Sequence, residues 1–494
     1  MLRCFLALCA LPLLAQQNQA PAPKTPDETP VVRQHEITLK GRTLKYTTTT
    51  GLMPIRNAEG VTEAHIFYMA YTLDGVTDPA KRRLMFSFNG GPGSSSVWLH
   101  LGALGPKRAK MLDDGALPAA PYQLVPNEET WLDETDIVFI DPVGTGYSRA
   151  VKPDLLAKFT SRNGDIQSVG EFIRLYLTRH KRWLSPLFLV GESYGTTRAA
   201  GLAGHLIDRG IAFNGIALVS TILNFQTARF TSGNDLPYPL ILPTYTATAH
   251  YHKRLPANLQ RRPLRDLLKE VEKWALGPYS EALAKGDALT PAERQSTAAQ
   301  LAAYTGLDPK FVDQGELRIS LPYFNRALLR DRTLLVGRLD SRLTGPGPRS
   351  LAATYEFDPS MSAIRPPYTA AFNHYVRAEL GYESDVEYHI LGGGIQRWNS
   401  NSEGEYVNVS DSLRAAFARN PHMKVYLGAG FYDMATPYFA AYYTLDHMGL
   451  APEVKANIRI HEYEAGHMYY IHLPALAATK RDVTAFLQWA APLQ

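Results

Sequence analysis

The sequence predicts an α/β protein in which helices cover both faces of a mostly parallel sheet. The first observation is a series of short apolar runs, each of which ends in a glycine-rich or polar turn. The second is that helical stretches lie between several of these runs, for example at residues 169–180 and 412–419. Strands that are apolar throughout and alternate with helices are typical of a sheet buried on both sides. The runs are RRLMFSFNGGPG (82–93), DIVFIDPVGTG (136–146), PLFLVGESYG (186–195), GIALVST (215–221), KVYLGAGFYD (424–433) and NIRIHEYEAGH (457–467).

Residues 1–15 are predicted to be a secretory signal peptide. The stretch MLRCFLALCALPLLAQQ has one basic residue, an apolar core of about a dozen residues, and small or polar residues after it, so we expect cleavage after Ala15. It is too short to span a bilayer. A buried N-terminal helix is the alternative. A lipid anchor at Cys9 is disfavoured because Leu8 is larger than that signal allows.

Both cysteines of the chain, Cys4 and Cys9, lie inside this segment. The mature protein is therefore expected to have no disulfide, no thiolate metal ligand and no cysteine nucleophile. An exported protein without disulfides is more typical of a bacterial envelope than of a eukaryotic secretory pathway. We expect an exported chain, periplasmic or extracellular.

The rest of the chain divides into four segments. Residues 16–35 are rich in proline and polar residues and are predicted to be a linker. From residue 36, alternating β-branched and aromatic residues indicate antiparallel strands, and residues 36–223 form the first part of the predicted core. Residues 224–405 are dominated by Ala, Leu and charged residues in helical patterns, which indicates a helical insertion that packs on the sheet. Residues 406–494 complete the core.

Charge and motif content argue against several classes of protein. The net charge is only +4, and no Lys/Arg-rich run favours a nucleic acid partner. No second apolar run is long enough to span a membrane. The stretch HEYEAGH lacks the histidine spacing of a zinc helix, and no phosphate-binding or dinucleotide-binding glycine motif is present. We expect no metal and no cofactor; the sequence carries no signal for the oligomeric state.

Ser193 lies between two glycines directly after an apolar run. A serine hydroxyl is a weak nucleophile, so it has to be exposed, fixed in position and placed beside a base. A sharp strand-to-helix turn achieves this, and Gly191 and Gly195 would allow the chain to fold back without colliding side chains. The turn could be purely structural, but the strand before it and the helical stretch after it favour a nucleophile.

A serine nucleophile in such a turn requires an acid and a histidine downstream, in that order. Asp433 ends one apolar run, and His467 follows the next. Asp433 could instead cap a helix, and His467 could be an ordinary buried or surface histidine. Asp446 and His461 are the rival pair, but Asp446 falls within a helical pattern and His461 within a strand.

The same chemistry needs two backbone N–H donors for the oxyanion. One is expected from Tyr194, the residue after the nucleophile. The other is expected from the glycine-rich turn in FSFNGGPGSSS, at Gly91. A plain tight turn is the alternative there.

Together, NGGPGSSS, DPVGTGYS, GESYG, the Asp after GAGFY, and GHM resemble the serine carboxypeptidase family of α/β-hydrolases, over residues 36–490. The resemblance implies a hydrolase fold with a helical cap, and removal of C-terminal residues from peptides at acid pH. It implies that Ser193 is the nucleophile, His467 the base and Asp433 its orienting acid. It further implies a substrate-binding role for three residues, Asn89, Gly90 and Glu192. A carboxyl group binds an anionic carboxylate only if one of the two is protonated, so binding should improve at acid pH.

The sequence departs from the family pattern at three positions. Phe88 replaces a Trp, Ser94 replaces a Cys, and Ala103 replaces the acid that partners the other carboxyl group. The last change removes part of the expected carboxylate-binding network, so other groups could bind the carboxylate. The candidates are Lys107, Arg108 and Arg198.

Three functions follow from these observations. The first is an exported serine carboxypeptidase whose partner is a peptide with a free C-terminal carboxylate. The second is an esterase or acyltransferase on the same fold, because acyl transfer uses the same acyl-enzyme with a different acceptor. The third is a non-catalytic binding protein, which is disfavoured because the serine, acid and histidine are all present.

Overall fold

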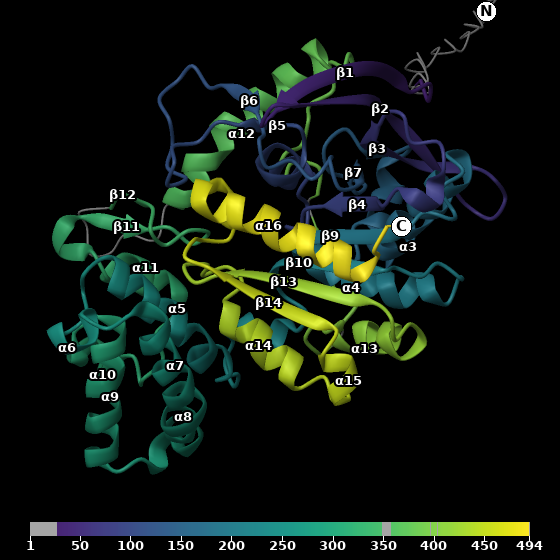
Figure 1. Ribbon diagram of the computed structural model, residues 1–494. Coiled ribbons are helices and arrows are strands. Elements are labelled where there is room, and N and C mark those ends of the chain that lie inside the picture. Colours follow the sequence, from purple (N-terminus) through teal and green to yellow (C-terminus); the bar gives the residue numbers. More distant parts are fainter. Residues whose placement is uncertain (1–26, 348–356, 396, 403, 494) are drawn as a thin grey trace, which may run out of the picture.

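A ten-stranded mixed sheet forms the centre of the molecule (Figure 1). The structure is a computed structural model that describes residues 27–347, 357–395, 397–402 and 404–493. The predicted signal peptide and the linker up to residue 26 lie outside the described residues. The strand order is β1-β2-β3-β7-β4-β9-β10-β13-β14, with β8 paired to β3. The strands are β1 (Val31–Leu39), β2 (Arg42–Arg56), β3 (Thr62–Leu73), β4 (Leu84–Phe88), β7 (Asp136–Ile140), β8 (Arg149–Ala150), β9 (Leu187–Ser193), β10 (Gly215–Thr221), β13 (Lys424–Gly430) and β14 (Ile458–Tyr463).

The strands from β7 to β14 in this order run parallel, whereas β1, β2 and β3 are antiparallel to their neighbours. Strand β7, with sequence DIVFI, is buried along its whole length, as expected for a strand covered on both faces. Because the carboxyl ends of parallel strands meet at one edge of the sheet, the turns that follow β4, β9, β13 and β14 come together there.

The fold begins earlier than the sequence suggested. Strand β1 starts at Val31, so the prediction of a linker up to residue 35 is wrong for residues 31–35. These residues pair in register with β2, from Val31 opposite Thr50 to His35 opposite Tyr46. The His35 ring also stacks on the Tyr46 ring, with 5.2 Å between centroids. The strand was overlooked because most of its side chains in this part are polar and exposed.

Helices cover both faces of the sheet, as predicted (Figure 1). On α3 (Arg162–Arg179) the residues at positions 169, 172, 173, 176 and 177 are buried, which is the spacing of one helix face. The side chain of Ser161 caps this helix by accepting a hydrogen bond from the Gly164 amide. The helices on the α3 face are α3 (Arg162–Arg179), α4 (Tyr194–Ile207), α13 (Ser410–Arg419) and α14 (Tyr438–Asp446), and α12 (Pro359–Ala378) and α16 (Leu473–Ala490) lie on the other.

The predicted insertion is mainly helical but occupies two places. Its first part forms a helical unit beyond one end of the sheet, at the lower left of Figure 1. Helix α12 lies apart from this unit and packs against the segment that follows β4 and against β5 (Lys107–Ala109). The helical unit consists of α5 (Pro237–Tyr251), α6 (Ala257–Gln260), α7 (Leu264–Trp274), α8 (Ser280–Lys285), α9 (Pro291–Thr305), α10 (Pro309–Gln314) and α11 (Leu321–Ala327).

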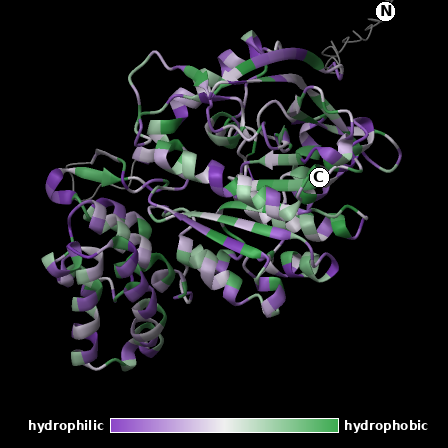
Figure 2. Ribbon diagram, viewed as in Figure 1, coloured by the Kyte–Doolittle hydropathy of each residue, from purple (hydrophilic) through white to green (hydrophobic). Residues whose placement is uncertain are grey.

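Figure 2 shows the apolar residues gathered in the central strands, while the helices of the insertion alternate between polar and apolar residues. On α7, for example, Leu264, Leu267, Leu268 and Val271 are buried, whereas Asp266, Lys269, Glu270 and Lys273 are exposed. Among the described helices, none combines the length and the apolar character needed to cross a membrane.

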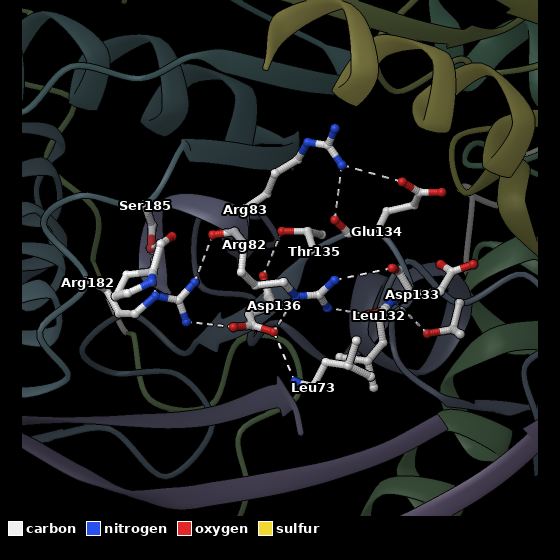
Figure 3. Close-up of polar contacts among 12 residues, drawn as sticks. Leu73, Arg82, Arg83, Leu132, Asp133, Glu134, Thr135, Asp136, Arg182 and Ser185 are labelled. Atoms are coloured by element: carbon white, nitrogen blue, oxygen red, sulfur yellow. Dashed lines mark hydrogen bonds and ion pairs between the residues drawn. The ribbon is translucent and has the colours of Figure 1, made fainter. Parts of the chain in front are cut away.

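The edge of the sheet where the parallel strands begin is held by a buried ion network around Asp136, the first residue of β7 (Figure 3). The Asp136 carboxylate accepts hydrogen bonds from Arg82 Nε at 2.8 Å and Arg182 Nη1 at 2.6 Å. It also accepts the Leu73 amide at 3.0 Å. One carboxylate thus joins the end of β3, the start of β4 and the segment after α3. The network lies at the opposite edge of the sheet from the turns after the strands.

Candidate active site

Ser193 lies at the junction of β9 and α4, in a strained backbone conformation with φ 60° and ψ −128°. Gly191 and Gly195, which flank this turn, are required because other backbone atoms approach them closely. A Cβ on Gly191 would lie 2.1 Å from the Gly195 carbonyl oxygen, and one on Gly195 would lie 2.9 Å from the Phe88 carbonyl oxygen. The sharp turn predicted from the sequence is therefore present, and the N–H groups of the first turn of α4 lie beside the serine.

The structure places Asp433 directly after β13 and His467 after β14, and it brings the two side chains into contact. His467 Nδ1 lies 2.7 Å from Asp433 Oδ2. Asp433 is fully buried, and its Oδ1 accepts the amides of Ala435 and Thr436 at 2.8 and 3.0 Å. With Nδ1–H donating to the carboxylate, Nε2 is the nitrogen left to accept a proton from a substrate or a nucleophile.

The protein environment holds His467 in place and changes its basicity. The His467 amide donates to the Leu339 carbonyl at 2.6 Å, and the Ser220 hydroxyl donates to the His467 carbonyl at 2.6 Å. Burial alone would lower the pKa of His467, but the charge and hydrogen bond of Asp433 outweigh it, and the pKa is raised. His467 is therefore a stronger base than a free imidazole.

The rival residues lie elsewhere. Asp446 is exposed on α14, with its carboxylate 3.4 Å from Lys455 Nζ. His461 pairs with Asp482 at 3.3 Å and stacks on the Tyr426 ring. The helix-cap alternative for Asp433 also fails, because the N-cap residue of α14 is Pro437.

A cavity of about 290 Å³ lies above Ser193 at the carboxyl edge of the sheet. Seven of the eight site residues expected from the sequence line this cavity. Asp433 does not line it, since it lies behind His467. The seven are Asn89, Gly90, Gly91, Glu192, Ser193, Tyr194 and His467.

The glycine-rich loop after β4 packs directly on the start of α4. A Cβ on Gly90 would lie 2.4 Å from the Tyr194 nitrogen and 2.7 Å from the Gly195 nitrogen, so no side chain fits there. Gly91 follows with φ +99°, a conformation that favours glycine. The loop that carries Gly91 thus packs against the start of α4, and both Gly91 and Tyr194 line the cavity, which is compatible with their expected role as oxyanion donors.

Glu192 is 3% exposed, next to Ser193 in the chain. Burial raises the pKa of Glu192 to about 7, against the opposing effects of His467, Tyr470 and Asn89. Its Oε1 lies 4.0 Å from His467 Nε2. The carboxyl group can therefore be neutral at mildly acid pH inside the cavity.

Comparison with known proteins finds that part of this chain is similar to serine carboxypeptidases. Residues 40–256 match the family model described as Serine carboxypeptidase. Serine carboxypeptidase-like 5 from Arabidopsis thaliana is 30% identical over 154 residues, which is 31% of this chain and 33% of that protein. Serine carboxypeptidase-like 16 from the same plant is 33% identical over 135 residues, or 27% of this chain and 29% of that protein. Residues 40–256 of the chain are therefore similar to the serine carboxypeptidase family.

The match in sequence is partial, whereas the match in fold is broad. The chain spans about a third of the length of the curated relatives it matches. The crystal structure of Kex1, a prohormone-processing carboxypeptidase from Saccharomyces cerevisiae, aligns with a TM-score of 0.57 and 16% identity. That alignment covers 89% of this chain and 91% of the yeast protein, so the two share the fold.

None of the three cations suggested for carboxylate binding lines the cavity. Lys107 pairs with Glu379. Arg198 pairs with Asp165 at 2.8 Å and donates to the Asn89 carbonyl at 2.6 Å, so it supports the glycine-rich loop from behind. Arg108 lies outside the cavity.

Sequence reasoning missed several residues of the cavity. The guanidinium-bearing residues Arg229 and Arg338 line it, as do the side chains of Trp98 and Met468. It also missed Tyr470, whose hydroxyl donates a hydrogen bond to Glu192 Oε2. The only sequence signal for Tyr470 is its position three residues after His467.

Proposed function

We propose that this protein is a serine carboxypeptidase that removes C-terminal residues from peptides through an acyl-enzyme on Ser193. One observation carries the proposal: a serine on a strained turn shares a cavity with a histidine, which is paired to a buried aspartate behind it, and with a carboxyl group that can be neutral. The first three side chains supply acyl transfer, and the fourth supplies a means of recognising a terminal carboxylate.

In the proposed reaction, the Ser193 hydroxyl attacks the carbonyl carbon of the last peptide bond. His467 accepts the hydroxyl proton on Nε2, while Asp433 holds the ring and stabilises the imidazolium. The Gly91 and Tyr194 amides bind the oxyanion, a type of contact whose loss costs about 10²–10³ in rate. The imidazolium then protonates the leaving amine, and water attacks the acyl-enzyme with His467 again acting as base.

The terminal carboxylate of the substrate is proposed to bind Glu192, Asn89 and Gly90. A carboxylate binds to a second carboxyl group only when one of the two groups is protonated. The raised pKa of Glu192, about 7, provides that proton at mildly acid pH without the substrate being protonated. Binding is therefore expected to weaken as the pH rises through about 7. This supports an acid preference while leaving the ester chemistry of Ser193 independent of Glu192.

An esterase or acyltransferase is the second candidate, and Ala103 favours it, because this position offers Glu192 no second carboxyl group. The intact Ser193, His467 and Asp433 argue against a non-catalytic binding protein. We further propose export, on the composition of residues 1–15; N-terminal sequencing of the protein recovered outside the cytoplasm would test this.

The deciding experiment is digestion of a small peptide library by the purified protein between about pH 4 and about pH 8, read by mass spectrometry. Stepwise loss of C-terminal residues, absent in Ser193→Ala, is the expected result. Ser193-dependent ester hydrolysis without peptide cleavage would replace the carboxypeptidase by the second candidate.

A further inference from the structure

Tyr470 makes a contact with the cavity that the proposed reaction does not yet use. It lies in η8 (Tyr469–Ile471), is 1% exposed, and donates its hydroxyl hydrogen to Glu192 Oε2. Glu192 is buried as well. A hydrogen bond between a hydroxyl and a buried carboxyl group is strong and directional, so it fixes the orientation of the carboxyl plane.

The tyrosine ring packs against the neighbouring helical turn at a glycine, where no side chain occupies the space. In η2 (His100–Leu104), a Cβ on Gly102 would lie 2.4 Å from Tyr470 Cε2 and 2.6 Å from the Tyr368 hydroxyl. The next residue, Ala103, is buried and its side chain carries no polar atom. The space beside Glu192 is thus occupied by an aromatic ring that carries one hydroxyl group.

The two oxygens of Glu192 face different partners. Oε2 accepts from Tyr470, and Oε1 lies 4.0 Å from His467 Nε2. The Asn89 side chain also hydrogen-bonds to the carboxyl group. With one oxygen fixed by the phenol, the other lies toward His467, and both residues line the cavity that holds Ser193.

We propose that Tyr470 is a positioning residue that fixes the Glu192 carboxyl group for recognition of a peptide's terminal carboxylate. This inference rests on the carboxypeptidase function proposed above. In this proposal the Tyr470 phenol makes the contact with Glu192 that a second carboxyl group would otherwise make. In this geometry the phenol acts only as a hydrogen-bond donor. The Glu192 carboxyl group therefore titrates without a second carboxyl group beside it.

Removal of the Tyr470 hydroxyl should change the pKa of Glu192 in a definite direction. The Tyr470 hydrogen bond lowers the pKa of Glu192, while burial, the larger effect, raises it. In Tyr470→Phe the pKa of Glu192 should therefore rise further, by about one unit, given the strength of hydrogen bonds to charged groups. Tyr470 itself stays protonated, because burial raises its pKa well above the usual value.

The other groups that face Glu192 keep the same charge in this variant. His467 and Asp433 come from the turns after β14 and β13, Asn89 from the loop after β4, Tyr469 from η8 and Tyr368 from α12, with Arg108 acting on Tyr368. None of them hydrogen-bonds to the Tyr470 hydroxyl among the described residues, so the change is confined to the Glu192 contact.

The test compares wild type, Tyr470→Phe and the control Tyr469→Phe, which loses a buried phenol from the same turn. Each is assayed across pH on an N-blocked dipeptide with a free carboxylate and on an N-blocked amino acid ester without one. For Tyr470→Phe we expect a several-fold higher KM for the dipeptide and an alkaline limb of kcat/KM shifted upward by about one pH unit. Ester hydrolysis and the control should stay within about twofold of wild type.

Equal losses on dipeptide and ester, or an unchanged alkaline limb in a folded Tyr470→Phe protein, would overturn the proposal. A double-mutant cycle with Glu192→Gln adds a second criterion. In the Gln background, removal of the phenol should leave the pH profile unchanged, because no titrating carboxyl group remains at position 192.

Infrared difference spectra between about pH 6 and about pH 9 separate this proposal from the carboxypeptidase function. The protonated carboxyl band that disappears in Glu192→Gln should persist to higher pH in Tyr470→Phe. If wild type cleaves esters but no peptide, the proposed function fails. An unshifted band would show that Tyr470 does not act on Glu192, whatever the substrate.

Discussion

His467 Nε2 lies 4.0 Å from Glu192 Oε1, so the group proposed as base and the group proposed to bind the substrate carboxylate are neighbours. Each is buried, and the negative charge of Glu192 contributes to the raised pKa of His467. At this distance the two groups titrate as a coupled pair with apparent pKa values that belong to the pair. The pH dependence of the proposed activity therefore reports on both groups together.

The first prediction concerns the shape of the pH profile. A peptide with a free carboxylate should give a bell: activity falls at low pH as His467 is protonated, and falls again above about pH 7 as Glu192 ionises. An ester substrate without a carboxylate should show only the acid limb. In Glu192→Gln the neutral amide cannot ionise, so the alkaline limb on the peptide should disappear. Steady-state kcat/KM measured on both substrates checks this.

The second prediction is that the ionised Glu192 carboxylate lowers the free energy of unfolding at alkaline pH. Its pKa is about 7 in the folded protein and near 4.5 when exposed, so the folded state holds the extra proton between these values. Stability therefore falls as pH rises from about 5 to about 7. Glu192→Gln should be more stable than wild type by about 1–3 kcal/mol at pH 8, and nearly equal to it at pH 5. Urea unfolding at the two pH values measures the difference; an equal gain at both would contradict it.

The third prediction concerns the network around Asp136, far from the cavity. Asp136→Asn leaves the buried Arg82 guanidinium and the partly buried Arg182 guanidinium facing a neutral amide. Breaking a buried ion pair from one side costs about 3–5 kcal/mol, so the thermal midpoint should fall by several degrees.

The matched control for this change is Asp446→Asn, which removes the carboxylate of an exposed pair with Lys455. Exposed pairs contribute about 0–1 kcal/mol, so little change is expected. Below its unfolding transition, Asp136→Asn should retain the kcat of wild type, because the network lies at the opposite edge of the sheet. A loss of kcat in the folded variant would show that the two edges are coupled.

The sequence was most informative where local chemistry dictates local structure. Ser193, Asp433 and His467 could be placed because each directly follows an apolar run, and parallel strands bring their carboxyl ends together. Gly90 and Gly91 could be placed because their turn allows no side chain. The start of β1 at Val31 was missed because an exposed edge strand is polar on most of its length.

Contacts between distant segments could not be predicted in the same way. Tyr470 is 278 residues from Glu192 in the chain, and their hydrogen bond depends on the missing side chain of Gly102. The composition of the insertion predicted helices, but nothing in the pattern of α12 distinguishes a helix that packs beside β5 from one in the separate helical unit. Arg229 was not singled out because an isolated arginine after a strand carries no motif.

The fourth prediction assigns a substrate preference to Arg229. Its guanidinium lies over the Phe225 ring, 5.3 Å from the centroid, and it is exposed at the cavity. No carboxylate among the described residues pairs with it. The Phe225 and Tyr194 rings, 6.4 Å apart, line the same cavity. If the substrate's terminal carboxylate binds at Glu192, we expect Arg229, Phe225 and Tyr194 to lie beside the substrate residue before the cleaved bond.

Arg229→Gln should therefore lower kcat/KM about three- to tenfold for dipeptides with Glu before the cleaved bond, and leave those with Leu there nearly unchanged. The effect is modest because an exposed ion pair contributes only about 1 kcal/mol. It should weaken with added salt, since screening acts on exposed charges. Arg338→Gln is the matched comparison: this second arginine of the cavity lies 3.8 Å from Asp358, so its charge is already partly balanced. Equal effects of the two substitutions on both peptides would place the preference elsewhere. The prediction requires that the unpaired guanidinium of Arg229 selects for an acidic side chain and that the partly paired Arg338 does not.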